Sequence, residues 1–293
     1  MTQKIGMIGI GFMGHGIATN LLKHGHSLVL LEHEGNQPLV DLVAVGAKTA
    51  KTPSNLAAQV DMVILVVTGS PQVESVLLGD DGVLNGMKPG TIIIDCSTAI
   101  PTSTDKVAKS VMAAGGLFLD SPMTRTPKEA ALGKLNLLVG GDPALFERCK
   151  PVLQCFAENI THAGAIGAGH RMKLLHNYVA LGTIAVLAEA AASAKIDGID
   201  LATFVEVLSK GGGAGVALER IKPFLLNGDS SNLQFSIANA LKDLGYYNTM
   251  AQDSGADRNI ADAIQRTLEI AVQDGHGQKL VPQLATVIAD RSK

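Results

Sequence analysis

The sequence predicts two domains: an α/β domain built on a doubly wound, mostly parallel sheet, followed by an all-α domain. A chain of 293 residues is long enough for both, since domains commonly have about 100 to 200 residues. As far as His162, short apolar runs alternate with segments of helix length, the order that parallel sheets require. Beyond Gly164 the β-branched runs stop, and Ala, Leu, Glu and Lys recur at helical spacing. We therefore expect domains over residues 1–163 and 164–293.

The elements of the first domain follow from its apolar runs, each short enough for a buried strand. The predicted strands are Lys4–Ile8, Ser27–Leu31, Met62–Val67, Thr91–Asp95, Leu117–Asp120, Leu135–Val139 and Asn159–His162. Between them, Gly14–His24 and Thr102–Ala114 have the length and spacing of helices. The second domain is expected to begin with a helix of about 25 residues, from near Gly169 to Ala194, which is long enough to connect the two domains.

Composition excludes several classes of function. With 24 Lys and Arg against 27 Asp and Glu, the net charge is −3, and the chain has few aromatic residues and no Trp. A nucleic-acid-binding domain needs a basic surface and rings on which bases can stack, so we expect no nucleic acid as a partner. We expect no membrane either, because the uninterrupted apolar runs are far shorter than the ~20 residues that span a bilayer.

The number and spacing of the cysteines predict neither disulfides nor a metal site. Cys96, Cys149 and Cys155 are odd in number and lack the spacing of Cys-x-x-Cys or Cys/His ligand sets. This pattern argues against a disulfide framework and predicts no metal site. We expect reduced thiols and a cytoplasmic location.

A glycine pattern predicts a dinucleotide-binding turn. Gly9, Gly11 and Gly14 fit G-x-G-x-x-G directly after the first predicted strand and at the start of the first predicted helix. The first glycine permits a tight turn, the second lets the backbone approach a pyrophosphate, and the third lets the helix pack on the strand. The backbone N–H groups of Phe12 and Met13 would then bind phosphate at the helix N-terminus. A glycine-rich turn without a ligand is the alternative.

Glu32 ends the second predicted strand, at about the 20-residue distance from the glycine turn at which a carboxylate binds the adenosine ribose hydroxyls. A carboxylate at this place repels a 2′-phosphate, and no Arg follows directly to bind one. The position therefore favours NAD over NADP as the cofactor. The alternatives are a solvated acid at a strand end and, for a 2′-phosphate, help from His33, Lys48 or Lys51.

Lys173 and Asn177 lie one turn apart on the long helix predicted at the start of the second domain, so they share one helix face. A Lys and an amide beside a bound carbonyl can donate a proton to a developing alkoxide and orient the substrate. Spacing alone does not separate this role from that of a Lys on a solvated helix surface.

These motifs occur in an order that resembles the β-hydroxyacid dehydrogenase family, whose members include 3-hydroxyisobutyrate dehydrogenase and tartronate semialdehyde reductase. The resemblance covers nearly the whole chain and is far more specific than any one motif. It rests on Gly9–Gly14, Asp95–Thr98, Asp120–Pro122, Gly167–Asn177 and Lys242–Gly245. It implies an N-terminal Rossmann domain, a C-terminal domain like that of 6-phosphogluconate dehydrogenase, an active site between them, and a homodimer or homotetramer.

The resemblance also implies roles for individual residues. Lys173 is the implied catalytic acid/base, which protonates or stabilises the alkoxide when hydride passes from the cofactor to an aldehyde, and Asn177 holds the substrate. The implied cofactor contacts beyond the glycine turn and Glu32 are Val67, Thr68, Thr98 and Lys242. The implied substrate contacts are Ser97, Thr124, Arg125, Thr126, Lys173 and Asn177.

One segment departs from the commonest family pattern. Where many members have Ser-Gly-Gly to bind a substrate carboxylate, this chain has Thr124-Arg125-Thr126. Arg125 adds a planar cation with several donors, which suits a larger or more highly charged oxyanion, and the Arg-Thr pair resembles the sulfolactaldehyde reductase branch. His176 stands where that branch has Asn. A surface ion pair between Arg125 and Glu129 is the alternative to an anion-binding role.

Three functions are therefore open. The first is an NAD-dependent oxidoreductase that interconverts a small β-hydroxy acid and its semialdehyde, with Lys173 as acid/base. The second and narrower one is a 3-sulfolactaldehyde reductase that uses Arg125 to bind the sulfonate. The third is a scaffold that senses NAD(P) without catalysis, which the presence of Lys173 disfavours. In the first two cases the partner is a small anionic hydroxy acid or aldehyde.

Overall fold

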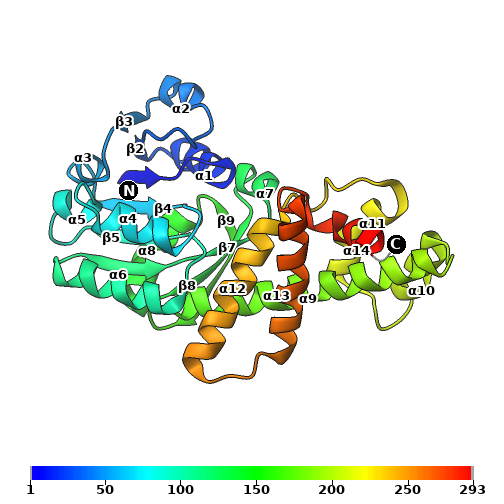
Figure 1. Cartoon of the computed structure of the whole chain (residues 1–293). Coiled ribbons are helices and arrows are strands. Elements are labelled where there is room, and N and C mark those ends of the chain that lie inside the picture. The colour runs from blue at the N-terminus through cyan, green and yellow to red at the C-terminus, as the bar shows by residue number, and fades with distance from the viewer. Residues whose placement is uncertain (1, 292–293) are drawn as a thin grey trace. The chain divides into compact units, whose positions relative to one another are not determined.

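The computed structural model describes residues 2–291 of the chain, which Figure 1 shows as a ribbon. The chain divides into two compact units, Met1–Lys173 and Leu174–Lys293. The division falls inside one long helix, α9 (Ala168–Ile196). Each unit has a hydrophobic core of its own.

The first unit is a mostly parallel sheet with helices on both faces, which confirms the predicted α/β class. Its strands are β1 (Lys4–Ile8), β2 (Ser27–Leu31), β3 (Lys48–Ala50), β4 (Met62–Leu65), β5 (Ile92–Asp95), β6 (Leu117–Asp120), β7 (Met123–Thr124), β8 (Leu135–Gly140) and β9 (Ala157–Gly164). Within the described residues they form one sheet in the order β3-β2-β1-β4-β5-β6-β8-β7, with β9 paired to β8. All neighbours from β3 to β6 are parallel, whereas β8 joins β6 antiparallel.

Helices cover both faces of this sheet, which is why its strands read as continuous apolar runs. The helices of the unit that precede α9 are α1 (Phe12–Lys23), α2 (Val40–Ala44), α3 (Pro53–Ala57), α4 (Ser70–Leu78), α5 (Val83–Gly86), α6 (Pro101–Ala113), α7 (Pro127–Ala131) and α8 (Pro143–Leu153). Side chains of β4 alternate between two clusters. Ile64 packs in the cluster that contains residues of α1 and α8, whereas Val63 and Leu65 pack in the cluster that contains residues of α3, α4 and α6.

The strand order places a switch point beside β1. The chain first builds outward from β1 to β2 and β3, and then returns to place β4 on the other side of β1. In open parallel sheets, ligands bind at the carboxyl ends of the strands where the order reverses in this way. The residues that follow β1 and β4 are therefore those that the fold makes available to a ligand.

Several boundaries differ from the sequence prediction. β4 ends at Leu65 and not at Val67, because the backbone N–H of Val67 donates to the Ser97 hydroxyl oxygen (3.0 Å) and not to a neighbouring strand. α1 begins at Phe12, one half-turn before the predicted Gly14. The short strands β3 and β7 and the five-residue helices were not predicted, since each is too short to show a period.

The second unit is helical, as predicted. After α9 its elements are α10 (Leu201–Ser209), α11 (Val216–Asn227), α12 (Ile237–Ser254), α13 (Asn259–Ala271), η1 (Val272–His276), η2 (Val281–Gln283) and α14 (Leu284–Arg291). α12 and α13 lie side by side, as the orange ribbons of Figure 1 show. Ile184 of α9, Ile221 of α11 and Leu244 of α12 meet in one core. The rings of Tyr178 and Tyr247 stack with their centroids 4.2 Å apart.

α9 is longer than the other helices that the structure describes. It has 29 residues and, over its most apolar window, a mean hydropathy of 1.6, so by length and composition alone it could cross a membrane. Half of that window is buried in the protein, and Ala188 and Ala191 belong to the core of the second unit. This burial is typical of the central helix of a globular domain, where small residues allow close packing.

Candidate active site

The glycine turn after β1 has the backbone geometry that a dinucleotide requires. Gly9 has a φ of +91°, and a Cβ there would collide with the carbonyl oxygen of Val66. A Cβ at Gly14 would collide with the carbonyl oxygen of Gly9, so the first turn of α1 packs directly on the loop. At Gly11, in contrast, a Cβ would have no atom within 4 Å. The turn is closely packed on its inner side and open at Gly11, where a pyrophosphate could approach the backbone.

The start of α1 supplies the donors for such a pyrophosphate. Gly11 is the N-cap of α1 and provides no side-chain cap. The next residues, Phe12 and Met13, therefore present their backbone N–H groups at the positive end of the helix dipole. Phe12 is 71% exposed, so its ring lies at the surface beside the turn.

The loop after β2 is fastened to the same turn. The Asn36 side chain accepts the backbone N–H of Ile10 (3.1 Å), and the N–H of Gln37 donates to the carbonyl oxygen of Ile10 (2.7 Å). Glu32 follows β2 directly, and its Oε1 accepts the hydroxyl of Thr49 (2.6 Å). The predicted ribose ligand thus lies at the end of a strand adjacent to the glycine turn, with its carboxylate oriented by β3.

The ends of β4 and β5 lie next to each other and share hydrogen bonds. Ser97 accepts the N–H of Val67 with its hydroxyl oxygen and donates its own N–H to Asp95 Oδ1 (2.9 Å). Burial raises the pKa of the Asp95 carboxyl. Thr68 is exposed and Thr98 is half-buried in the loops that follow these strands. The structure therefore brings together four of the predicted residues: Val67, Thr68, Ser97 and Thr98.

The segment after β6 departs from one prediction. Arg125 has a φ of +83°, a left-handed conformation that costs about 1 to 2 kcal/mol for a residue other than glycine. Its Nη1 donates to the carbonyl oxygen of Lys134 and to Glu158 Oε2 on β9 (2.6 Å). The predicted alternative, an ion pair with Glu129, is wrong. Glu129 instead accepts the N–H and hydroxyl of Thr126 and caps α7.

The remaining residue of this segment, Thr124, is held by the sheet, and Lys173 of α9 is bonded to the residue before it. Thr124 belongs to β7, and its hydroxyl oxygen accepts the side-chain N–H of Asn136 on β8 (3.1 Å). The ammonium of Lys173 donates to the carbonyl oxygen of Met123 (2.7 Å), the residue before Thr124. The predicted acid/base therefore lies at the segment that is predicted to bind the substrate anion.

In the second unit, a buried carboxylate joins two predicted residues. Asp243 Oδ2 accepts the side-chain N–H of Asn177 (2.7 Å), and its Oδ1 accepts the ammonium of Lys242 (2.7 Å). Asp243 is 3% exposed. Asp243 belongs to the Lys242–Gly245 motif, but no role was predicted for it. The available signal was an acid beside a Lys within an apolar helical segment.

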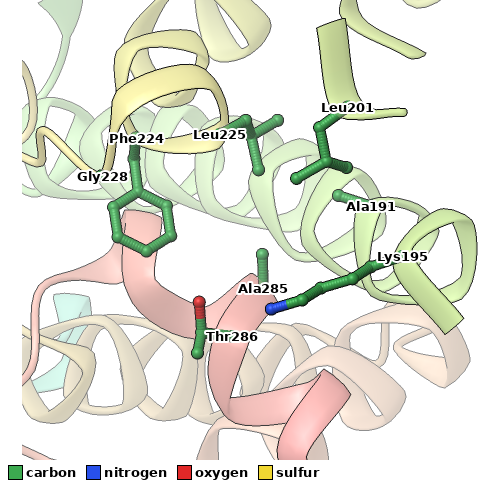
Figure 2. Close-up of a pocket in the computed structure, with 8 residues that line it drawn as sticks. All are labelled: Ala191, Lys195, Leu201, Phe224, Leu225, Gly228, Ala285 and Thr286. Atoms are coloured by element: carbon green, nitrogen blue, oxygen red, sulfur yellow. The ribbon is translucent and has the colours of Figure 1, made fainter. Parts of the chain in front are cut away.

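The second unit also carries a pocket, which Figure 2 shows. Leu201, Phe224 and Leu225 form its apolar wall, and the Lys195 ammonium and Thr286 hydroxyl are its polar groups. None of the residues that line it is among the predicted site residues. We therefore do not place the chemistry there.

Comparison with known proteins gives consistent matches along the chain. Residues 4–164 match the family described as the NAD binding domain of 6-phosphogluconate dehydrogenase, and residues 167–288 match the one described as "NAD-binding of NADP-dependent 3-hydroxyisobutyrate dehydrogenase". The chain is 31% identical over 284 residues to the NAD-dependent L-serine dehydrogenase of Pseudomonas aeruginosa, covering 94% of this chain and 95% of the relative.

Two further relatives extend these matches. The chain is 34% identical over 242 residues to the 3-sulfolactaldehyde reductase of Escherichia coli, covering 82% of this chain and 80% of the relative. The solved structure of Mycobacterium tuberculosis 3-hydroxyisobutyrate dehydrogenase with L-serine superposes with a TM-score of 0.88 at 26% identity, over 98% of this chain and 99% of that one. The similarity thus extends through both units.

Proposed function

The chain belongs to the β-hydroxyacid dehydrogenase family, and from this premise we propose that it interconverts a small β-hydroxy acid and its semialdehyde. It is an oxidoreductase that acts on a CH–OH group, and its cofactor is NAD. The glycine turn fits this cofactor, because Gly11 is open to a pyrophosphate while Gly9 and Gly14 close the turn behind it. The nicotinamide ring of NAD supplies a hydride acceptor or, when reduced, a hydride donor.

The hydrogen bond from Lys173 to the Met123 carbonyl oxygen carries the proposal. It holds the ammonium next to Thr124, in the segment that would bind the substrate's anionic group. An ammonium has three donors, so the one that Met123 accepts fixes its place while the group remains a proton donor for an alkoxide oxygen. Lys173 gives this proton in reduction of the semialdehyde and takes it back in oxidation of the alcohol. Asn177, one turn later on α9, orients the substrate.

The substrate's anion is the open part of the proposal. Arg125 is the cation of this segment, and the glycine-like backbone conformation at its position brings its guanidinium to Glu158. A substrate carboxylate or sulfonate would compete with Glu158 for the guanidinium. We propose carboxylates as the main substrate class, because two of the similar proteins are an L-serine dehydrogenase and a 3-hydroxyisobutyrate dehydrogenase bound to L-serine.

A spectrophotometric panel tests this function. Formation of NADH or NADPH at 340 nm, a wavelength that reports the reduced nicotinamide, would be followed with L-serine, 3-hydroxyisobutyrate, glycerate, 4-hydroxybutyrate and 2,3-dihydroxypropanesulfonate. We expect turnover of a carboxylate with NAD. Lys173→Ala should lower kcat by about 10² to 10⁴, the range for removal of a general acid/base. Lys195→Ala, a substitution of the same kind on the same helix, is the matched control.

The outcomes separate the alternatives. If Lys173→Ala turns over like Lys195→Ala, Lys173 is not the acid/base. A panel without any turnover by a protein that binds NADH would support the non-catalytic scaffold.

The second candidate is sulfonate reduction, which the 34% identity to 3-sulfolactaldehyde reductase favours. Arg125 is the residue that this function requires. Arg125→Gln should then raise the KM for 2,3-dihydroxypropanesulfonate much more than the KM for any carboxylate. An equal effect on both anions would leave Arg125 as a general anion ligand and remove the case for sulfonate specificity.

A further inference from the structure

His170 lies in the first turn of α9 and is fully buried. Both ring nitrogens have partners: Nδ1 lies 2.7 Å from the Thr104 hydroxyl oxygen, and Nε2 lies 3.1 Å from the Ser97 carbonyl oxygen. Because a carbonyl oxygen only accepts, Nε2 carries a proton and donates it to Ser97. Burial of an imidazole is unfavourable unless its nitrogens are hydrogen-bonded. The ring therefore joins α9 to Thr104 on α6 and to the loop after β5.

Two buried carboxylates complete this group. Oδ2 of Asp95 and Oδ2 of Asp120 each lie 3.9 Å from a nitrogen of the His170 ring. Asp120 also accepts the backbone N–H groups of Gly167 (2.7 Å) and His170 (2.8 Å). These are N–H groups at the start of α9 that the helix itself does not satisfy, and a negative charge is stabilised there by the helix dipole. Asp120 thus fixes the start of α9 to the end of β6.

The backbone around His170 leaves no room for a shift. A Cβ at Gly169 would collide with the carbonyl oxygen of Leu138 and lie 2.8 Å from Asp120 Oδ2. The first turn of α9 therefore packs directly on β8 and on the end of β6. Any movement of this turn would break either the bonds to Asp120 or those of the ring.

We infer that His170 is a positioning residue for Lys173, an inference that rests on the proposed function. Lys173 lies one turn after His170, about 4.5 Å along the helix axis at 1.5 Å per residue. The ring ties this turn to Ser97, a predicted substrate contact whose hydroxyl oxygen also accepts the N–H of Val67, a predicted cofactor contact. His170 thereby holds the acid/base at a fixed place relative to the ends of β4 and β5. Delivery of a hydride and a proton to one carbonyl requires such a fixed relation.

Substitutions of Thr104 test this role with little change in shape. Thr104→Val removes the hydroxyl that faces Nδ1, whereas Thr104→Ser keeps it. Val107→Ala is the matched control, since Val107 is fully buried on the same helix and belongs to the hydrophobic core. We expect Thr104→Val to lower kcat by about 10 to 100-fold, because a displacement of about 1 Å can cost about 100-fold. The Kd for NADH should stay near that of the wild type, and Thr104→Ser should restore most of kcat.

A second measurement does not depend on turnover. Acetic anhydride acylates unprotonated amines, and mass spectrometry of the Lys173 peptide gives its rate of labelling as a function of pH. A displaced Lys173 loses its bond to Met123, so we expect faster labelling in Thr104→Val than in the wild type or in Val107→Ala.

The outcomes distinguish the inference from the function on which it rests. Unchanged kcat and unchanged labelling in Thr104→Val would overturn the positioning role. An equal loss of kcat in Val107→Ala would also overturn it, because the effect would then be one of general stability. If Lys173→Ala keeps its turnover, the acid/base assignment is wrong, and the labelling rates still decide whether His170 and Thr104 hold Lys173 in place.

Discussion

A methyl group added at Gly11 should weaken cofactor binding and leave the stability of the fold nearly unchanged. Gly11 has a φ of −72° and a ψ of −166°, which alanine also adopts, and a Cβ there has no atom within 4 Å. Alanine restricts the unfolded chain and so raises the free energy of unfolding by about 0.4 to 1 kcal/mol. It is also a poorer N-cap than glycine by up to about 1 kcal/mol. The two effects nearly cancel, and we expect the stability of Gly11→Ala to lie within about 1 kcal/mol of the wild type.

Binding should respond differently. The methyl group would occupy the open side of the turn, where the pyrophosphate approaches the backbone, so the Kd for NADH should rise at least about tenfold, or about 1.4 kcal/mol. Gly14→Ala provides the contrast. Its Cβ would collide with the carbonyl oxygen of Gly9, and because a backbone atom cannot move independently we expect a loss of about 1 to 3 kcal/mol in stability.

Two simple measurements check both variants. Urea denaturation followed by circular dichroism gives the free energy of unfolding, and NADH fluorescence gives its Kd without interference, since the chain has no Trp. If Gly11→Ala is folded and binds NADH as tightly as the wild type, the pyrophosphate does not approach the turn at this residue. If Gly14→Ala is as stable as the wild type, the packing of α1 on the turn is not as tight as the geometry requires.

Three further predictions follow from individual side chains. Burial raises the pKa of the Cys149 thiol from 9.0 to about 11. The buried neutral thiol therefore stabilises the fold fully below pH 9, and the free energy of unfolding decreases by about 2 kcal/mol as the pH rises to 11. In denaturation of Cys149→Ala, this part of the decrease in the free energy of unfolding at alkaline pH should be missing. Arg125→Gly removes the strain of a left-handed Arg, so its free energy of unfolding should not fall, whereas its KM for anionic substrates should rise with kcat little changed. Asp243→Asn removes the charge that Asn177 and the half-buried Lys242 ammonium bind, and we expect a loss of about 1.5 to 3 kcal/mol in urea denaturation and a higher KM through a displaced Asn177.

The features that the sequence predicts correctly depend on residues that are close together in the chain. The glycine turn depends on residues within one strand-turn-helix unit, so the order of an apolar run, three glycines and a helical segment was sufficient to predict it. The face shared by Lys173 and Asn177 is likewise a property of helical spacing alone. The α/β and all-α classes follow from periodicity over many residues. None of these conclusions requires knowledge of which distant segments meet.

The partners of Arg125 could not be predicted in the same way. Spacing along a helix suggested Glu129, but Arg125 precedes α7 and has a positive φ, so its side chain is not on that helix. Its partner Glu158 lies on β9, and β9 comes near only because it pairs with β8 in parallel. The buried ring of His170 presents the same difficulty. Its bonds to Ser97 and Thr104 join segments that the sequence separates by more than 60 residues.

Two buried acids explain how one helix can serve two sets of contacts. Asp120 holds the start of α9 within the first unit, and Asp243 holds Asn177 within the second. A carboxylate is suited to this task, because it accepts several N–H groups at once and its bonds to them are stronger than those of a neutral acceptor. The helix between these two anchors is continuous, so the rise from Lys173 to Asn177 is set at about 6 Å, slightly more than one turn. The spacing of the proposed acid/base and the proposed substrate ligand is therefore a property of α9 itself, while each end of the pair is oriented by the unit that surrounds it.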